Sequence, residues 1–113
     1  MWENGRQGTG YLKLKLINRW RFFSKYKWDL YLLRYPTDSN IPRHRDPVPN
    51  HKHYRLNVYL WNAAVGGIPS HDDVIINNRF FTLFRPDICT HSVSPVVKGT
   101  RYVLSFGISK LIS

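Results

Sequence analysis

Short runs of alternating apolar and polar residues recur along the chain, and they leave few folds open other than an all-β one. In residues 54–61, apolar side chains stand at every second position, which is the period of a half-buried β-strand. Turn-forming residues separate the runs at the spacing of a β-sandwich or barrel, with about eight core strands after residue 28. The expected strands are residues 11–17, 28–35, 54–61, 73–76, 79–84, 90–97 and 100–108, with short ones near His44 and Ile68.

The sequence also predicts two turns between strands and contains one stretch whose secondary structure is ambiguous. Asn77-Asn78 suits a tight hairpin turn, and Lys98-Gly99 predicts a second hairpin between the last two long strands. Only residues 18–28 could form a helix, so we expect at most one short N-terminal helix. Its basic and aromatic residues could bind phosphates and stack bases, but we favour packing of the aromatic rings on the sheet.

The chain of 113 residues predicts one domain, residues 1–113. A composition of 42% hydrophobic and 15% aromatic residues argues against disorder. One cysteine, Cys89, excludes an internal disulfide and fits a reducing compartment. No apolar stretch approaches the ~20 residues of a membrane span, and the N-terminus has no signal-peptide pattern. We therefore expect a soluble, cytoplasmic protein that does not enter a membrane.

The formal net charge of +10 limits the choice of partners. An excess this large favours an acidic partner: nucleic acid, an anionic membrane surface or an anionic small molecule. A role in solubility alone is the competing explanation.

The segment NIPRHRDPV contains the first candidate site. His44 and Asp46 are two residues apart, so on a strand their side chains point the same way and could share a metal. His91, about 45 residues further on, offers a third ligand. Two histidines and one carboxylate form a facial triad, which leaves coordination positions open and suits non-haem Fe(II).

Other interpretations of these histidines are weaker. A protein-kinase catalytic loop is excluded because Asn50 stands four rather than five residues after Asp46, and no glycine-rich phosphate loop is present. A second His-x-Asp pair begins at His71, close to His91 along the chain, and remains a less favoured metal pair. His51 and His53 could bind zinc, but no cysteines accompany them, and we expect solvated loop residues.

A cation follows the third candidate ligand. Arg101 lies ten residues after His91, across the Lys98-Gly99 turn. A hairpin of that length would place Arg101 near His91, where its guanidinium could clamp a carboxylate with two hydrogen bonds.

With these residues in place, the sequence resembles the Fe(II)/2-oxoglutarate-dependent oxygenases, which fold as a double-stranded β-helix, or jelly roll. The resemblance covers roughly residues 28–108 and rests on LLRYPTDSNIPRHRDPV, RLNVYL, FRPDICTHSVSPV and GTRYVLSFGI. It implies that His44, Asp46 and His91 hold iron and that Arg101 pairs with the distal carboxylate of 2-oxoglutarate. Tyr35 matches a tyrosine that lines the cosubstrate pocket, and Asn57 is placed to reach the keto-acid end.

The resemblance also implies an activity. The chain is expected to be a dioxygenase that uses Fe(II), 2-oxoglutarate and O2, helped by ascorbate, to hydroxylate a C–H bond and release succinate and CO2. The substrate is open: the charge suggests an anionic molecule or nucleic acid, while a peptidyl proline or a small molecule also fits, because the metal and arginine motif does not encode the substrate. The alternative is a non-catalytic, basic jelly-roll module that binds nucleic acid and keeps a vestigial metal site. Because the chain lacks long helical supports, a homo-oligomer is a further expectation.

Overall fold

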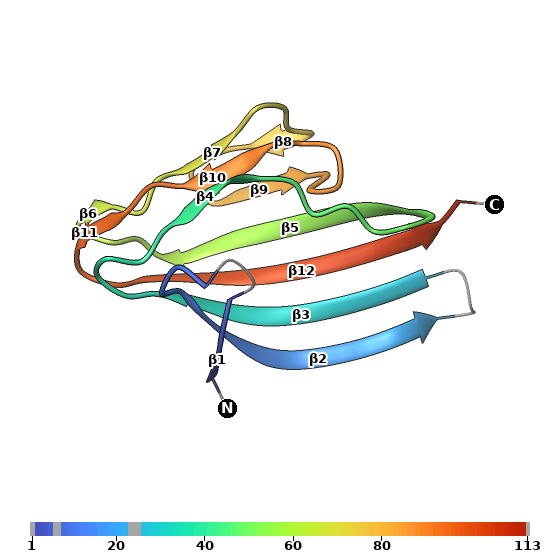
Figure 1. Ribbon diagram of the computed structural model, residues 1–113, viewed down its shortest axis with the longest axis horizontal. Coiled ribbons are helices and arrows are strands. Elements are labelled where there is room, and N and C mark those ends of the chain that lie inside the picture. Colours follow the sequence, from blue (N-terminus) through green and yellow to red (C-terminus); the bar gives the residue numbers. More distant parts are fainter. Residues whose placement is uncertain (1, 6–7, 23–25, 113) are drawn as a thin grey trace.

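The computed structural model describes the backbone of residues 2–5, 8–22 and 26–112 and, outside residues 17–22, their side chains. These residues form twelve strands and no helix, so the all-β jelly-roll prediction is confirmed (Figure 1). The strands are β1 Trp2–Asn4, β2 Leu12–Phe22, β3 Tyr26–Tyr35, β4 Ile41–His44, β5 His51–Trp61, β6 Val65–Gly66, β7 Pro69–His71, β8 Ile76–Asn77, β9 Phe81–Phe84, β10 His91–Val93, β11 Val96–Lys98 and β12 Arg101–Leu111.

Long strands form one large sheet, and short strands lie over part of it. The major sheet has seven strands in the order β1-β2-β3-β12-β5-β9-β8. A three-stranded minor sheet has the order β4-β10-β7, and β11 pairs with β6. In Figure 1 the short strands lie along one end of the long ones, so the opposite end of β3, β12 and β5 extends beyond them.

The last strand, β12, holds the major sheet together. It pairs antiparallel with β3 over ten residue pairs, from Arg101–Tyr35 to Lys110–Tyr26, and with β5 on its other side. Both partners lie far from β12 along the sequence. Since side chains alternate between the two faces of a strand, Arg101, Val103, Ser105 and Ser109 all point to the inner side, which the minor sheet partly covers.

The stretch expected to be the only possible helix is strand instead. Residues 18–22 belong to β2 and residues 26–28 to β3, which pair antiparallel. Residues 23–25, with Phe23, lie outside the described residues, and so do the side chains of Trp20 and Phe22. A neighbouring strand satisfies the backbone donors and acceptors of this stretch, which the local sequence pattern does not reveal.

The two expected hairpins turned out differently. β8 and β9 do pair, but Asn77 and Asn78 do not have positive φ; the Asn78 Oδ1 accepts hydrogen bonds from the Phe80 and Phe81 amides and forms a longer turn. The second hairpin prediction was wrong, because Lys98-Gly99 does not join two paired strands. β10 pairs with β4 and β7, whereas β12 belongs to the major sheet.

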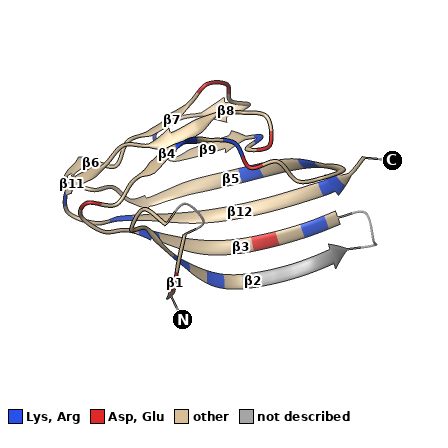
Figure 2. Ribbon diagram, viewed as in Figure 1, with Lys and Arg blue, Asp and Glu red and all other residues tan. Residues whose placement is uncertain are grey.

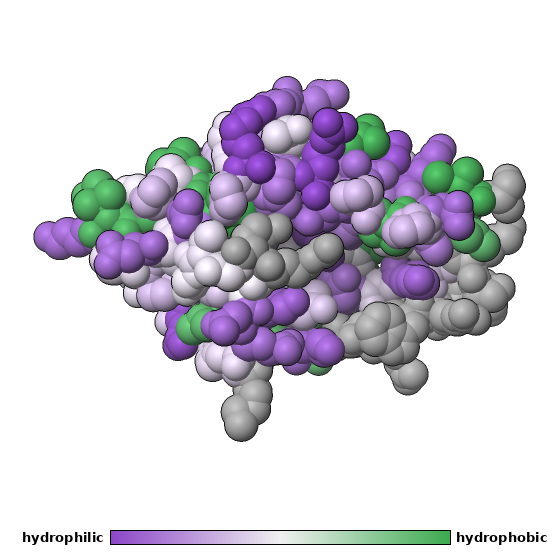
Figure 3. Space-filling model, viewed as in Figure 1, coloured by the Kyte–Doolittle hydropathy of each residue, from purple (hydrophilic) through white to green (hydrophobic). Residues whose placement is uncertain are grey.

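The apolar core lies between the two layers, at the end that the short strands cover. Its buried members are Tyr11, Tyr35, Ile41, Val93, Val96 and Val103. The outward side of the major sheet is also apolar, and the described residues contain no helix to cover it: Trp61 is 68% exposed and Leu60 52%. Figure 3 shows further hydrophobic side chains at the end of the molecule where β6 and β11 lie. Val65 of β6 and Val97 of β11 are exposed. No helix long and apolar enough to cross a membrane occurs in the part of the chain described.

Candidate metal centre

Strand pairing in the minor sheet brings two histidines together. His44 ends β4 and His91 begins β10, and the two are direct partners across the antiparallel pair. Their ring centroids lie 4.3 Å apart. Two residues that are far apart in the sequence thus become neighbours because their strands are adjacent in a sheet.

Both imidazole rings are oriented by the backbone. The Nδ1 of His44 lies 2.7 Å from the carbonyl oxygen of Pro42, and the Nδ1 of His91 lies 2.9 Å from that of Cys89. A carbonyl only accepts, so Nδ1 carries the proton in each ring. The Nε2 lone pair is therefore free to bind a metal, which is the arrangement typical of metal-binding histidines.

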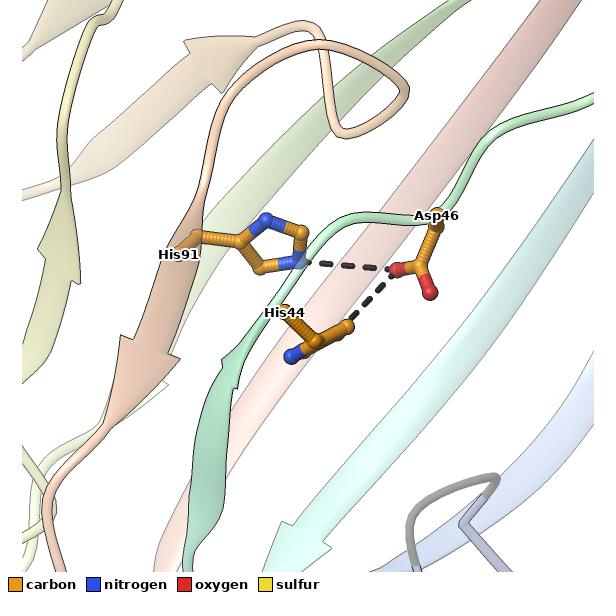
Figure 4. Close-up of side chains that lie close together, drawn as sticks. All are labelled: His44, Asp46 and His91. Atoms are coloured by element: carbon orange, nitrogen blue, oxygen red, sulfur yellow. Dashed lines mark ion pairs between the residues drawn. The ribbon is translucent and has the colours of Figure 1, made fainter.

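A carboxylate completes the cluster. The Oδ2 of Asp46 lies 3.3 Å from the Nε2 of His44 and 3.5 Å from that of His91 (Figure 4). Asp46 follows the end of β4 rather than lying on the strand as expected, and its amide donates to the carbonyl of Pro86. The three candidate ligand atoms lie within 4.8 Å of one another. Two imidazoles and one carboxylate on one side of a potential ion fit Fe(II) and leave room for other ligands.

The second His-x-Asp pair is split up in the structure. His71 packs beside His91 with 6.0 Å between ring centroids, whereas Asp73 is exposed and its backbone carbonyl accepts a hydrogen bond from the Cys89 thiol. In the described part of the chain, the metal-ligand cluster contains neither His71 nor Asp73. The buried Phe84 ring contacts both His71 and His91 edge-on and forms an apolar wall behind the cluster.

Arg101 lies in the same cavity, about 340 Å³ in volume, as the three candidate ligands. The residue is only 2% exposed, and its guanidinium lies 5.0 Å from the ring centres of both Tyr35 and Tyr59. No carboxylate of the described residues is within ion-pair distance, and its Nε has no hydrogen-bond partner. Burial lowers the pKa of the guanidinium. A buried cation without a counter-ion is costly, so this arrangement favours an anionic ligand.

The hairpin that was expected to bring Arg101 to His91 does not exist, yet both residues line one cavity. Arg101 enters from the major sheet and His91 from the minor sheet. The two layers face each other across the cavity, and this non-local packing takes the place of the predicted local turn.

Tyr35 and Asn57 also line the cavity. Tyr35 is the strand partner of Arg101, stacks on Tyr11 at 5.4 Å, and burial raises the pKa of its phenol. Asn57 lies on β5, and its Oδ1 accepts a hydrogen bond of 2.6 Å from the Ser105 hydroxyl. Tyr35 thus lies at the arginine end of the cavity, and Asn57 belongs to a separate polar network.

Sequence reasoning missed that polar network. The Nη2 of Arg55 donates to both Asp29 oxygens, at 2.9 and 3.0 Å, and its Nη1 donates to the Ser105 hydroxyl at 2.7 Å. The pair spans from β5 to β3 above Gly107 of the central strand, where a Cβ would lie 2.2 Å from the guanidinium. A glycine between a basic and an acidic residue on adjacent strands gives no signal in a single sequence.

The expectation of a solvated His53 was wrong. His53 lies on β5, is 8% exposed and has no hydrogen-bond partner for its Nδ1 in the described residues. Burial, helped by the charge of Arg55, lowers its pKa to about 4. The imidazole is therefore neutral at pH 7.

This depressed pKa predicts a loss of stability in weak acid. Between pH 6.5 and about 4 the unfolded chain binds a proton at residue 53 that the folded chain does not bind, so stability falls as the pH falls through this window. Each pKa unit corresponds to about 1.4 kcal/mol at most. Urea unfolding of wild type and His53→Gln at pH 7 and pH 5 measures how much the free energy of unfolding falls between these two pH values. The variant should lose less stability than wild type, and equal losses would contradict the prediction.

The fold and the cluster together define a class: a double-stranded β-helix with two histidines and one carboxylate at its cavity. No protein-family model and no curated protein matches the chain. Among solved structures, the collagen prolyl hydroxylase of Paramecium bursaria Chlorella virus-1, in complex with 2-oxoglutarate, is similar with a TM-score of 0.58 and 19% identity.

The alignment covers 77% of this chain and 61% of the viral enzyme. The chain therefore spans less than two thirds of its neighbour. At this identity the similarity establishes the fold, while the site must be argued from its own residues.

Proposed function

We propose that the protein is an Fe(II)- and 2-oxoglutarate-dependent dioxygenase that hydroxylates a C–H bond. One observation carries the proposal: a buried arginine without a counter-ion shares a cavity with a cluster of two histidines and one carboxylate. The similarity to a prolyl hydroxylase solved with 2-oxoglutarate supports it.

The residues present fit the metal. His44 and His91 would bind it through Nε2, and Asp46 through Oδ2. Three protein ligands leave positions open for a cosubstrate and for O2. Bound there, Fe(II) supplies the redox chemistry that activates O2. The backbone carbonyls of Pro42 and Cys89 hold each ring in the tautomer that binding requires.

Arg101 would hold the distal carboxylate of 2-oxoglutarate. Its guanidinium is kept in place by Tyr35 and Tyr59, so little side-chain freedom is lost on binding. A charge-assisted hydrogen bond is worth about 1.5–3 kcal/mol, or roughly one to two decades of affinity. Tyr35 would line this end of the cavity, and Asn57 would be in reach of the keto-acid end.

The overall reaction then balances without another reductant. One O2 provides one oxygen atom to the C–H bond, which becomes C–OH, and the other to 2-oxoglutarate, which becomes succinate and CO2. The apolar wall of Phe84, the buried Tyr35 and the half-buried Tyr59 would shield this end of the cavity from water.

A non-catalytic, basic binding module remains the second candidate, favoured by the net charge of +10. The enzyme and the binding module are distinguished by incubating the protein with Fe(II), ascorbate, O2 and 2-oxoglutarate and measuring the succinate formed. Many enzymes of this chemistry turn over slowly without substrate, so we expect succinate above the protein-free control. Succinate at the control level, with the chain folded and loaded with iron, would favour the binding module.

A further inference from the structure

The inner face of β2 and β3, toward one edge of the major sheet, carries lysines from the covered end to the open end. Lys13 of β2 and Lys27 of β3 line the cavity, and Lys15 is the strand partner of Tyr31, another lining residue. Leu12 and Leu14 alternate with Lys13 and Lys15 along β2, so their side chains point to the outward side. A face turned toward a protein interior is ordinarily the apolar one. Lysines at these positions indicate a surface that meets a ligand in water rather than a packed core.

These three lysines are not neutralised by the protein. In the described part of the chain, none lies within ion-pair distance of a carboxylate. Glu3 faces Lys13 from the edge strand β1, and Asp29 is engaged by Arg55. Figure 2 shows Lys and Arg on the described parts of β2 and β3, with an acidic segment on β3. The surface is therefore positively charged and has unused cations.

An aromatic ring lies among these cations. Tyr31 lines the cavity, and the ammonium of Lys13 is 5.3 Å from the centre of its ring. Rings next to lysines in an open groove are how proteins bind single-stranded nucleic acid: the phosphates contact the cations and the bases stack on the rings.

Beyond Tyr31 lies a set of groups that both donate and accept hydrogen bonds. Arg55 and Asp29 neutralise each other, Ser105 extends the network, and His53 carries the buried Nδ1 without a partner in the described residues. A pattern of mixed donors and acceptors without net charge suits the edge of a nucleobase better than another phosphate.

We propose that this inner face, defined by Lys13, Lys15, Lys27 and Tyr31, binds single-stranded nucleic acid and presents one of its nucleotides to the metal centre. That the nucleic acid is the substrate of the metal centre rests on the proposed function. That this face binds nucleic acid does not depend on it. A peptide is less well matched, because its neutral backbone leaves the lysines without counter-charges.

The test measures binding of a fluorescein-labelled single-stranded 12-mer by anisotropy between 50 and 200 mM KCl, without iron or 2-oxoglutarate. The triple variant Lys13→Gln, Lys15→Gln, Lys27→Gln is compared with a charge-matched control, Arg79→Gln, Lys98→Gln, Lys110→Gln, whose residues are exposed and lie away from this face. We expect the first variant to lose roughly tenfold or more in affinity, and its slope of log affinity against log KCl concentration to become shallower by about two. The control variant should lose less than about threefold in affinity.

Equal losses in the two variants would overturn the inference, because net charge alone would then explain binding. So would stronger binding of a labelled polyglutamate peptide that depends on the same three lysines. The succinate assay on wild type distinguishes the two proposals. Succinate without lysine-dependent binding overturns only this inference, whereas lysine-dependent binding without succinate supports the surface and contradicts the enzyme.

Discussion

Replacing Asp46 with alanine is expected to reduce succinate formation by at least about 100-fold, and His44→Ala should do the same. Loss of an outer-shell partner of a metal already costs roughly 10- to 100-fold, and loss of a direct ligand costs more. Asp46 contributes the only carboxylate of the cluster and approaches both histidines. The measurement is succinate produced per chain under saturating Fe(II) and 2-oxoglutarate.

Asp73→Ala is the matched control, because it removes the acid of the other His-x-Asp pair and Asp73 is exposed. It should retain nearly full activity. Metal content after gel filtration shows whether the Asp46 variant has lost the ion or only its reactivity. Persistent turnover in His44→Ala, or a loss in Asp73→Ala as large as in Asp46→Ala, would refute the assignment.

The second large effect is expected at Arg101. Arg101→Met should raise the 2-oxoglutarate concentration needed for half-maximal succinate formation by about 10- to 100-fold, which corresponds to the 1.5–3 kcal/mol of a charge-assisted hydrogen bond. Arg101→Lys should fall in between, because it keeps the charge and loses the planar fork. Initial rates at varied 2-oxoglutarate measure both variants.

Thermal unfolding separates a binding role from a structural one. Removing a buried charge that lacks a counter-ion is neutral or stabilising, so Arg101→Met without ligand should melt at or above the wild-type temperature. The same variant should lose the increase in melting temperature that 2-oxoglutarate gives wild type. A variant that melts much lower and still responds to 2-oxoglutarate would mean that Arg101 supports the fold and binds no cosubstrate.

The sequence predicts the long strands well because their signal is local. The alternation in residues 54–61 and 100–108 corresponds to β5 and β12. The partners of a strand are not local, and this is why the 98–99 hairpin was wrong: nothing in that stretch indicates that β10 and β12 belong to different sheets. The expectation that residues 18–28 could form a short helix was wrong for the same reason, because the backbone groups of this stretch are satisfied by pairing between β2 and β3.

The candidate site was predictable to the extent that its residues form a motif. The spacing of His44, Asp46 and His91 was enough to expect the cluster, and the structure brings the three together. The network around Arg55 was not predictable, because Asp29, Gly107 and Arg55 meet only through the register of three strands. The buried state of His53 likewise depends on which face of β5 turns inward.

The most direct test of the central claim is a thermal-shift titration of the wild-type protein with 2-oxoglutarate, with and without one equivalent of Mn(II) as a redox-inert substitute for Fe(II). A ligand at 100 times its dissociation constant stabilises the folded state by about 2.7 kcal/mol. The account predicts a saturating increase in melting temperature that needs the metal and disappears in Asp46→Ala. An increase that is the same without metal, or no increase at all, would contradict it.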